Sequence, residues 1–97
     1  MTFQKHDSGK PPISYLGQFY PALGEVASLL RHGHEKYGKD DNWKHCPDLR
    51  RYRDALGRHY LQYTGGEKID ESGHHHLAAV VVNALFLLML DKESDDA

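Results

Sequence analysis

The stretch Asp70–Leu90, DESGHHHLAAVVVNALFLLML, is the part of the chain that decides the fold. It opens with acidic residues and three consecutive histidines, and from Leu77 to Leu90 its only polar side chain is Asn83. That apolar run is shorter than the roughly 20 residues needed to cross a bilayer. A soluble helix that is apolar on all sides must be covered on every side. We therefore expect the central helix of a small helical domain, or a helix shared with a second copy.

Length and composition set limits on the rest of the protein. The chain has 97 residues, enough for one domain with a limited interior. Its net charge of -2 gives no basic field, so we expect no nucleic acid polymer as a partner. The single cysteine, Cys46, excludes an intrachain disulfide and suits a reducing cytoplasm. The N-terminus lacks the apolar core of a signal peptide, so we expect a cytoplasmic protein with no membrane contact.

The chain divides into an arm, a domain and a tail. Residues 1–12 are polar and end in two prolines, which predicts a flexible N-terminal arm. Residues 13–91 form the single helical domain, in which the segment Ile13–Tyr20 is expected to lie across the helices as a packing strap. Residues 92–97 are an acidic tail, expected to be frayed and solvated.

Three main helices are predicted within the domain. The first begins at Pro21, weakens near Gly33 and ends at Gly38, where glycine suits a left-handed cap. The second runs from about Pro47–Asp48 to Tyr63. Their apolar stripes consist of Leu23, Val26, Ala27, Leu30 and Tyr37 in the first, and of Leu49, Tyr52, Leu56, His59 (or Tyr60) and Tyr63 in the second.

The third helix is the apolar stretch itself, with Asp70 or Ser72 as its expected cap. The fold class is therefore all-α, a small bundle of three main helices. Too many apolar side chains of the third helix face different directions for a three-helix monomer to cover them. We accordingly expect the bundle to be completed by homo-oligomerisation.

Acidic and imidazole side chains are the first candidates for chemistry. Oxygen-rich clusters hold Mg²⁺ or Mn²⁺, and such ions usually serve phosphate chemistry. The candidate metal ligands are Glu35, Asp54, Asp70 and Glu71. His59 and His76 are both predicted to point inward, where they could be satisfied structurally or could bind something. A zinc site that includes these two histidines is the less favoured alternative, because no HExxH or CxxC motif is present.

Cationic and aromatic residues suggest a partner that carries phosphate. The arginines of the second helix, among them Arg51 and Arg58, fit either a solvated face or a phosphate chain. Trp43 is either a packing plug or, beside Asn42, Lys36 and Tyr37, part of a platform on which a base stacks.

The motifs GKPPIS, HEKYG, DNW, RYRDALGRHYLQYTGGE and IDESGHHHLAAVVVNALFLL occur in this order over residues 9–91. Together they resemble a small, mainly phage-encoded family, the N-terminal domain of dATP/dGTP diphosphohydrolases. That family is similar in style to the all-α MazG-like nucleotide pyrophosphohydrolases. The resemblance implies a metal-dependent cleavage of a purine deoxynucleoside triphosphate into monophosphate and pyrophosphate, in the host cytoplasm if the chain is phage-encoded.

The resemblance also implies roles for residues that match the motifs. Those implied to be catalytic are His59, Asp70, Glu71 and His76. Those implied to bind the nucleotide are Lys36, Tyr37, Asn42, Trp43, Arg51 and Arg58. The expected cofactor is Mg²⁺ or Mn²⁺.

One departure from the MazG-like pattern keeps other functions open. A helical Glu-x-x-Glu pair is missing, because Glu35 has His32 three residues before it and Gly38 three after it. Glu67-x-x-Asp70 matches the second MazG-like motif only in a predicted loop. The alternatives are a protein that sequesters a nucleotide or a nucleotide signal without cleaving it, and an interaction protein whose apolar helix serves to dimerise.

Overall fold

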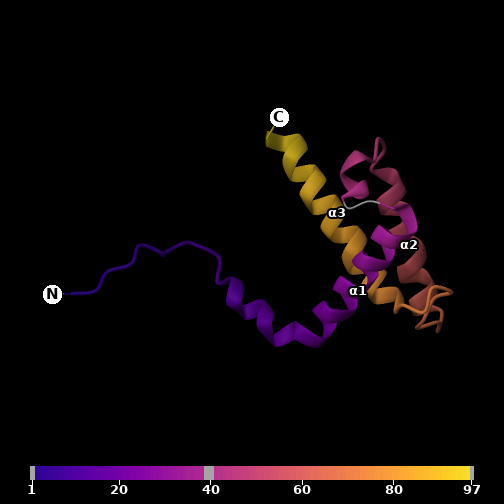
Figure 1. Cartoon of the computed structure of the whole chain (residues 1–97), viewed down its shortest axis with the longest axis horizontal. Coiled ribbons are helices and arrows are strands. Elements are labelled where there is room, and N and C mark those ends of the chain that lie inside the picture. Colours follow the sequence, from indigo (N-terminus) through magenta and orange to yellow (C-terminus); the bar gives the residue numbers. More distant parts are fainter. Residues whose placement is uncertain (1, 39–40, 97) are drawn as a thin grey trace.

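The computed structural model describes residues 2–38 and 41–96, with side chains up to Lys92. Within these ranges the elements are η1 (Ile13–Phe19), α1 (Tyr20–Tyr37), η2 (Asn42–His45), α2 (Arg50–Thr64) and α3 (His76–Asp96). Helix α2 packs along α3, and α1 packs against α3 (Figure 1). The described residues contain no strand beyond one isolated bridge, so the all-α prediction is confirmed. The loop expected after Gly38 includes residues 39–40, which lie outside this description.

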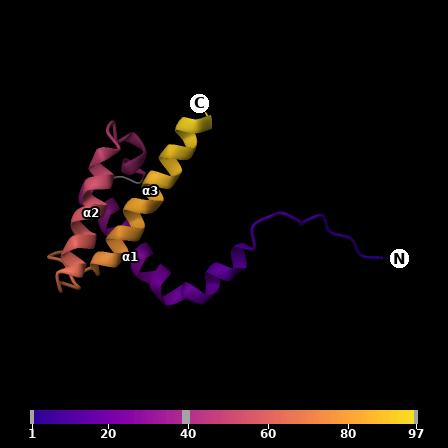
Figure 2. The ribbon, with the colours of Figure 1, turned by 180° about the vertical axis from the view of Figure 1, so that it is seen from behind.

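Helix α3 is the centre of the packing, as expected. The buried apolar residues of the described chain are small: Ala78, Ala79 and Val82 on α3, with Val26 on α1. Small side chains on α3 let the backbones of its neighbours approach closely. Figure 2, from behind, shows α2 and α3 side by side and joined at one end by the segment between them. This junction contains Asp70 and Glu71 and leads into the three consecutive histidines.

Helix α1 ends as predicted but buries less than predicted. Gly38 closes it with φ 73° in the left-handed region, and its N–H donates to the His34 carbonyl oxygen. The helix continues through Gly33 without a break. Of the expected apolar stripe only Val26 is buried, while Leu23 and Leu30 are each 40% exposed. The stripe was too broad because, among the helices, α1 packs mainly against α3.

Helix α2 matches the predicted stripe. Leu49, Tyr52, Leu56, His59 and Tyr63 are all half-buried. The helix begins at Arg50, slightly later than predicted, after Asp48 accepts a hydrogen bond from the Arg50 N–H. The Arg50 guanidinium also binds the Asp48 carboxylate at 3.0 Å. These two bonds from Arg50 lower the pKa of Asp48.

The predicted cap of the third helix is wrong. Helix α3 begins only at His76, and the side chain of His75 accepts a hydrogen bond from the Leu77 N–H. Asp70 and Ser72 belong instead to a turn in which Gly73 has φ 86°. The turn forms because the Asp70 carboxylate accepts hydrogen bonds from both the N–H and the hydroxyl of Ser72. This local side-chain bonding competes with helix formation.

The N-terminal segment does not form the expected strap. Residues 2–12 extend away from the bundle, and η1 contacts α1 but not α2 or α3 (Figure 1). The large side chains of η1 and of the first residue of α1 are exposed: Ile13, Tyr15, Leu16, Phe19 and Tyr20. Residue alternation alone suggested a packed segment, but the segment has no surface to lie on within this chain.

The far end of α3 is also uncovered. The helix continues past Leu90 to Asp96, so the backbone of most of the predicted acidic tail is helical. Side chains after Lys92 lie outside the description. Leu88 is 62% exposed and Met89 is 47% exposed. In the part of the chain that is described, no helix is both long and apolar enough to cross a membrane. Homo-oligomerisation stays a prediction.

Candidate functional site

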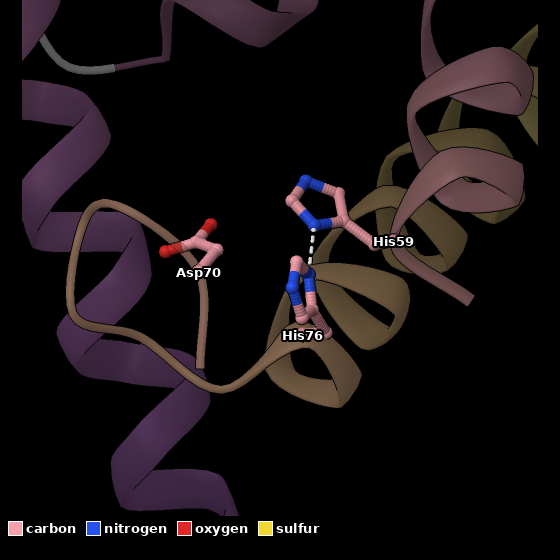
Figure 3. A group of neighbouring side chains, drawn as sticks. All are labelled: His59, Asp70 and His76. Atoms are coloured by element: carbon pink, nitrogen blue, oxygen red, sulfur yellow. Dashed lines mark hydrogen bonds between the residues drawn. The ribbon is translucent and has the colours of Figure 1, made fainter. Parts of the chain in front are cut away.

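The most buried polar side chain of the described structure is His76, the first residue of α3, which is 1% exposed. Its Nδ1 lies 2.8 Å from Nδ1 of His59 on α2 (Figure 3). Two neutral imidazoles can share only one proton between these nitrogens, so one ring donates and the other accepts. The inward orientation of both histidines, expected from the sequence, is what the structure shows.

The second nitrogen of His76 lacks a hydrogen-bond partner. Oε2 of Glu67 lies 3.2 Å from Nε2, within ion-pair distance, but the contact does not have hydrogen-bond geometry. A buried polar group without a hydrogen bond costs about 1–3 kcal/mol. The carboxylate of Glu67 is close enough to take up this bond with a small rotation, and its side chain is 55% exposed.

Two backbone hydrogen bonds close the segment between α2 and α3 into a tight hairpin. The His76 N–H donates to the Lys68 carbonyl oxygen at 2.8 Å, and the Asp70 N–H donates to the His74 carbonyl oxygen at 2.9 Å. This backbone pairing, rather than a helix cap, holds Asp70 beside the start of α3. It explains how a loop carboxylate reaches the two histidines.

Asp70 is held as a carboxylate. Partial burial is the largest single influence and raises the pKa of Asp70, but the hydrogen bonds from Ser72 and from the His74 backbone, together with nearby His59, outweigh it, so the net pKa is lowered. The pKa of His59 is also lowered, first by burial and then by the nearby charge of His76 when that ring is protonated. Near neutral pH the pair therefore consists of an ionised acid and an uncharged imidazole, both able to accept hydrogen bonds or to coordinate a cation.

His59, Asp70 and His76 together form the one group among the described residues whose donors could hold a metal ion. One ligand atom from each lies within 4.8 Å of the others. Figure 3 shows the Asp70 carboxylate, on the connecting loop, beside the two facing rings. Two imidazole nitrogens and one carboxylate oxygen are a donor set typical of transition-metal sites.

A cavity of about 680 Å³ opens beside this group. It is bounded by the second half of α1, by η2, by α2 and by α3, and both His59 and Asp70 line it. The volume falls within the range of about 300–1,000 Å³ of small-molecule sites. The buried His76 does not line it and lies behind His59.

Part of the cavity wall is aromatic. The ring of Trp43 on η2 stacks on Phe86 of α3, with centroids 5.0 Å apart and planes 10° from parallel. Tyr52 packs against Phe86 from the other side of the cluster, and its hydroxyl donates to the Trp43 carbonyl oxygen at 3.0 Å. Burial, together with the neighbouring Cys46 thiol, raises the pKa of Tyr52 to about 12, so its hydroxyl keeps the proton. Tyr52 thereby fixes η2 against α2.

The structure separates the predicted site residues into two groups. Those that line the cavity are Lys36, Tyr37, Asn42, Trp43, Arg51, His59 and Asp70. Those that do not line it are Glu35, Asp54, Arg58, Glu71 and His76. In the second group all but His76 are exposed. The acidic residues Glu35, Asp54 and Glu71 also stand outside the group of potential ligands.

Three residues at the site were not among the predicted site residues. Glu67 approaches His76, and Phe86 and Tyr52 build the aromatic wall. Phe86 and Tyr52 carried the signal of core residues, since both lie on apolar helix positions. For Glu67 the available signal was its spacing in Glu67-x-x-Asp70.

Comparison with known proteins matches the chain to a protein family. A family model described as dATP/dGTP diphosphohydrolase, N-terminal, matches residues 2–97. No curated protein and no solved structure matches the chain.

Proposed function

Because the chain belongs to the family of dATP/dGTP diphosphohydrolase N-terminal domains, we propose that it hydrolyses a purine deoxynucleoside triphosphate to the monophosphate and pyrophosphate. The family name implies a nucleotide substrate. One observation carries the proposal: aromatic side chains and the pair His59 and Asp70 line the same cavity. A nucleotide can use both features. Its base stacks on aromatic rings, and its phosphates bind a metal ion that His59 and Asp70 could hold.

The aromatic wall suits a purine. Stacking on an aromatic ring stabilises a bound base by about 1–3 kcal/mol. Trp43 and the neighbouring Tyr37 supply rings, and Asn42 supplies an amide that can hydrogen-bond to the edge of a base. Asn83 uses its amide nitrogen on the Ala79 carbonyl oxygen at 2.8 Å. Its own side-chain oxygen is left to accept a hydrogen bond within the cavity.

Two cationic side chains of the cavity lining can bind phosphate, and a bound metal ion would add further positive charge. Arg51 and Lys36 line the cavity and offer donors to phosphate oxygens, arginine as a planar fork and lysine as a point charge. When bound, a divalent ion such as Mg²⁺ or Mn²⁺ would screen the triphosphate and activate water for attack on the α-phosphorus. Asp70, ionised by its hydrogen bonds, and neutral His59 are the protein groups that face this position. His76 holds the ring of His59 from behind.

The direct test is turnover by the full chain. The protein is incubated with dATP or dGTP and with Mg²⁺ or Mn²⁺, and products are separated by ion exchange. We expect equal amounts of monophosphate and pyrophosphate, and slower turnover of dCTP and dTTP. Free phosphate with the diphosphate, or no product from any triphosphate, would refute the proposal.

A variant pair tests the aromatic wall. Trp43→Ala should raise KM for dATP about 10-fold, with a smaller effect on kcat, because stacking holds the base in both ground and transition states. Tyr60→Ala, at an exposed position of α2 outside the cavity, is the matched control and should keep both constants. An unchanged KM in Trp43→Ala would show that the base does not stack on this wall.

A second candidate function is binding of a nucleotide, or of a nucleotide signal, without cleavage. It is favoured by one observation: within the described residues Asp70 is the only carboxylate of the potential metal group. Thermal unfolding separates the two functions. A ligand that binds only the folded state raises the melting temperature, so a shift with dATP and no product over hours would favour a sequestering protein.

The setting we propose is the cytoplasm, that of the host if the chain is phage-encoded, with the protein acting as a homo-oligomer and without nucleic acid polymer or membrane as partner. Cys46 is a free, half-buried thiol whose Sγ contacts the Asp48 carbonyl oxygen at 3.3 Å. A thiol in this position suits a reducing compartment.

A further inference from the structure

We propose that His59, Asp70 and His76 form a site for one transition-metal ion of the Zn²⁺ and Co²⁺ class, which Mg²⁺ does not fill. The inference goes beyond the proposed hydrolysis, because binding of the ion is measured directly and does not need turnover. It also differs from an ion that arrives with the nucleotide, since these ligands are protein groups present before the substrate binds.

The first support is the arrangement of the donors. The two Nδ1 atoms are 2.8 Å apart, and a ligand atom of Asp70 lies within 4.8 Å of both rings. Two nitrogens bound to one tetrahedral ion at the usual 2.0–2.1 Å are about 3.3 Å apart. A small opening of the two rings therefore makes room for the ion, which would occupy the place of the proton they now share.

The second support is an unsatisfied buried atom. His76 is 1% exposed, and its Nε2 has no hydrogen-bond partner although Glu67 Oε2 is 3.2 Å away. Histidines that ligate metals commonly donate their other N–H to a carboxylate, which fixes the tautomer that coordinates. Glu67 stands where such a carboxylate is required. With Nε2 protonated toward Glu67, the Nδ1 lone pair points to His59 and to the ion.

The third support is donor type. Imidazole nitrogen suits Zn²⁺, Co²⁺ and similar ions, whereas Mg²⁺ prefers an octahedron of oxygens. The exposed acids Glu35, Asp54 and Glu71 do not join the group and so do not turn it into an oxygen site.

The fourth support is access. Structural metal sites are closed by four protein ligands, whereas catalytic sites keep a position open. Here three protein groups converge, and His59 and Asp70 also line the cavity. The open side of the site therefore faces the space in which a triphosphate would lie. Glu67 acts on the ion only through His76 and is a positioning residue.

The experiment is a titration of the full chain, stripped with EDTA and dialysed, with Co²⁺ followed by visible absorption. We expect one Co²⁺ per chain with the visible bands of a low-coordinate site, displacement by Zn²⁺, and no displacement by millimolar Mg²⁺. Absence of these bands, or removal of Co²⁺ by millimolar Mg²⁺, would overturn the proposal.

Variants assign the ligands. His59→Ala and Asp70→Asn should abolish the Co²⁺ bands, with circular dichroism confirming that the helices persist. Asp54→Asn, at an exposed position of α2, and His6→Ala, in the N-terminal arm, are matched controls that should bind as the wild type does. Glu67→Gln should weaken Co²⁺ binding about 10–100-fold, as is usual when a carboxylate that orients a ligating histidine is replaced, without changing the melting temperature of the metal-free protein. Wild-type Co²⁺ binding in both His59→Ala and Asp70→Asn would place the ion elsewhere.

The result is distinguishable from the fate of the proposed function. Co²⁺ binding by a protein that cleaves no nucleotide would support this site and refute the hydrolase. Turnover of dATP in Mg²⁺ alone, by a protein that binds no Co²⁺, would support the hydrolase and refute this site.

Discussion

The two ends of α3 reverse the usual relation between polarity and burial. At its start the polar His76 is 1% exposed, whereas toward its end the apolar Leu88 is 62% exposed. The first turn is enclosed by α2 and by the hairpin that pairs His76 with Lys68, while the last turns extend past the ends of the neighbouring elements (Figure 1). Hydropathy alone therefore does not explain which residues of α3 are covered. We expect chemistry at the covered end and a second copy of the chain at the uncovered end.

Replacing the buried His76 at the start of α3 should have the largest effect on stability and turnover. His76→Ala deletes a buried ring and leaves Nδ1 of His59 without its partner, so we expect the free energy of unfolding to fall by about 2–4 kcal/mol and turnover to be lost. Urea unfolding followed by circular dichroism measures the change. Leu61→Ala, a control at a position that is 69% exposed, should stay within about 0.5 kcal/mol of wild type. Equal losses in the two variants would contradict the burial of His76.

The same end contains two adjacent acids with different surroundings. Asp70→Asn should lower kcat by more than about 100-fold. Asp70 is a proposed metal ligand, and replacing a residue that merely supports a ligand already lowers activity about 10–100-fold. Glu71→Gln should stay near the wild-type rate, since Glu71 is exposed and does not line the cavity. Steady-state kinetics with dATP compare the two. A larger loss in Glu71→Gln than in Asp70→Asn would reverse the assignment.

The exposed end predicts self-association. If a second copy covers α3, light scattering should give a multiple of the 11.1 kDa chain mass, and Leu88→Glu should shift the protein toward the monomer. Leu61→Glu introduces the same charge at an equally exposed apolar position on α2 and should leave the mass unchanged. A monomeric wild type at micromolar concentration would show that the end of α3 needs no cover.

The smallest expected effect is a pH dependence of the metal-free protein. The pKa of His59 is lower in the folded chain than the value of about 6.5 expected in the unfolded chain. As the pH falls below about 6.5, the unfolded chain therefore binds a proton at His59 more readily than the folded chain does. This contribution to stability is complete above about pH 6.5 and declines as the pH falls toward the folded pKa. Urea unfolding at several pH values, with EDTA present, should show a shallower decline in His59→Gln. Identical pH profiles for wild type and variant would exclude this effect.

Most of the fold follows from local sequence signals. The apolar stretch after Leu77, Pro21 near the start of α1 and the left-handed Gly38 at its end predicted the helices well. The start of α3 was not predictable from capping preference, because Asp70 and Ser72 bond to each other in a turn. The exposure of η1 was not predictable either, since apolar residues indicate packing but not whether a surface is within reach.

The sequence predicted which types of residue form the site better than it predicted which of these residues contact one another. Helical periodicity directed His59 and His76 inward, and the structure places them in contact. It could not show that Arg58 turns away from the cavity while Arg51 lines it, because that choice depends on the angle at which α2 crosses α3. The approach of Glu67 to His76 depends on the closed hairpin, whose backbone pairing leaves little trace in the sequence.

The hairpin between α2 and α3 brings together every donor of the proposed centre. His59, Asp70 and His76 all lie in one short continuous stretch, so little chain entropy is lost when they meet. We expect a centre built from such local contacts to form early in folding. Substitutions in the aromatic wall, which lies outside this stretch, should therefore alter the preferred nucleotide and leave the three donors in place.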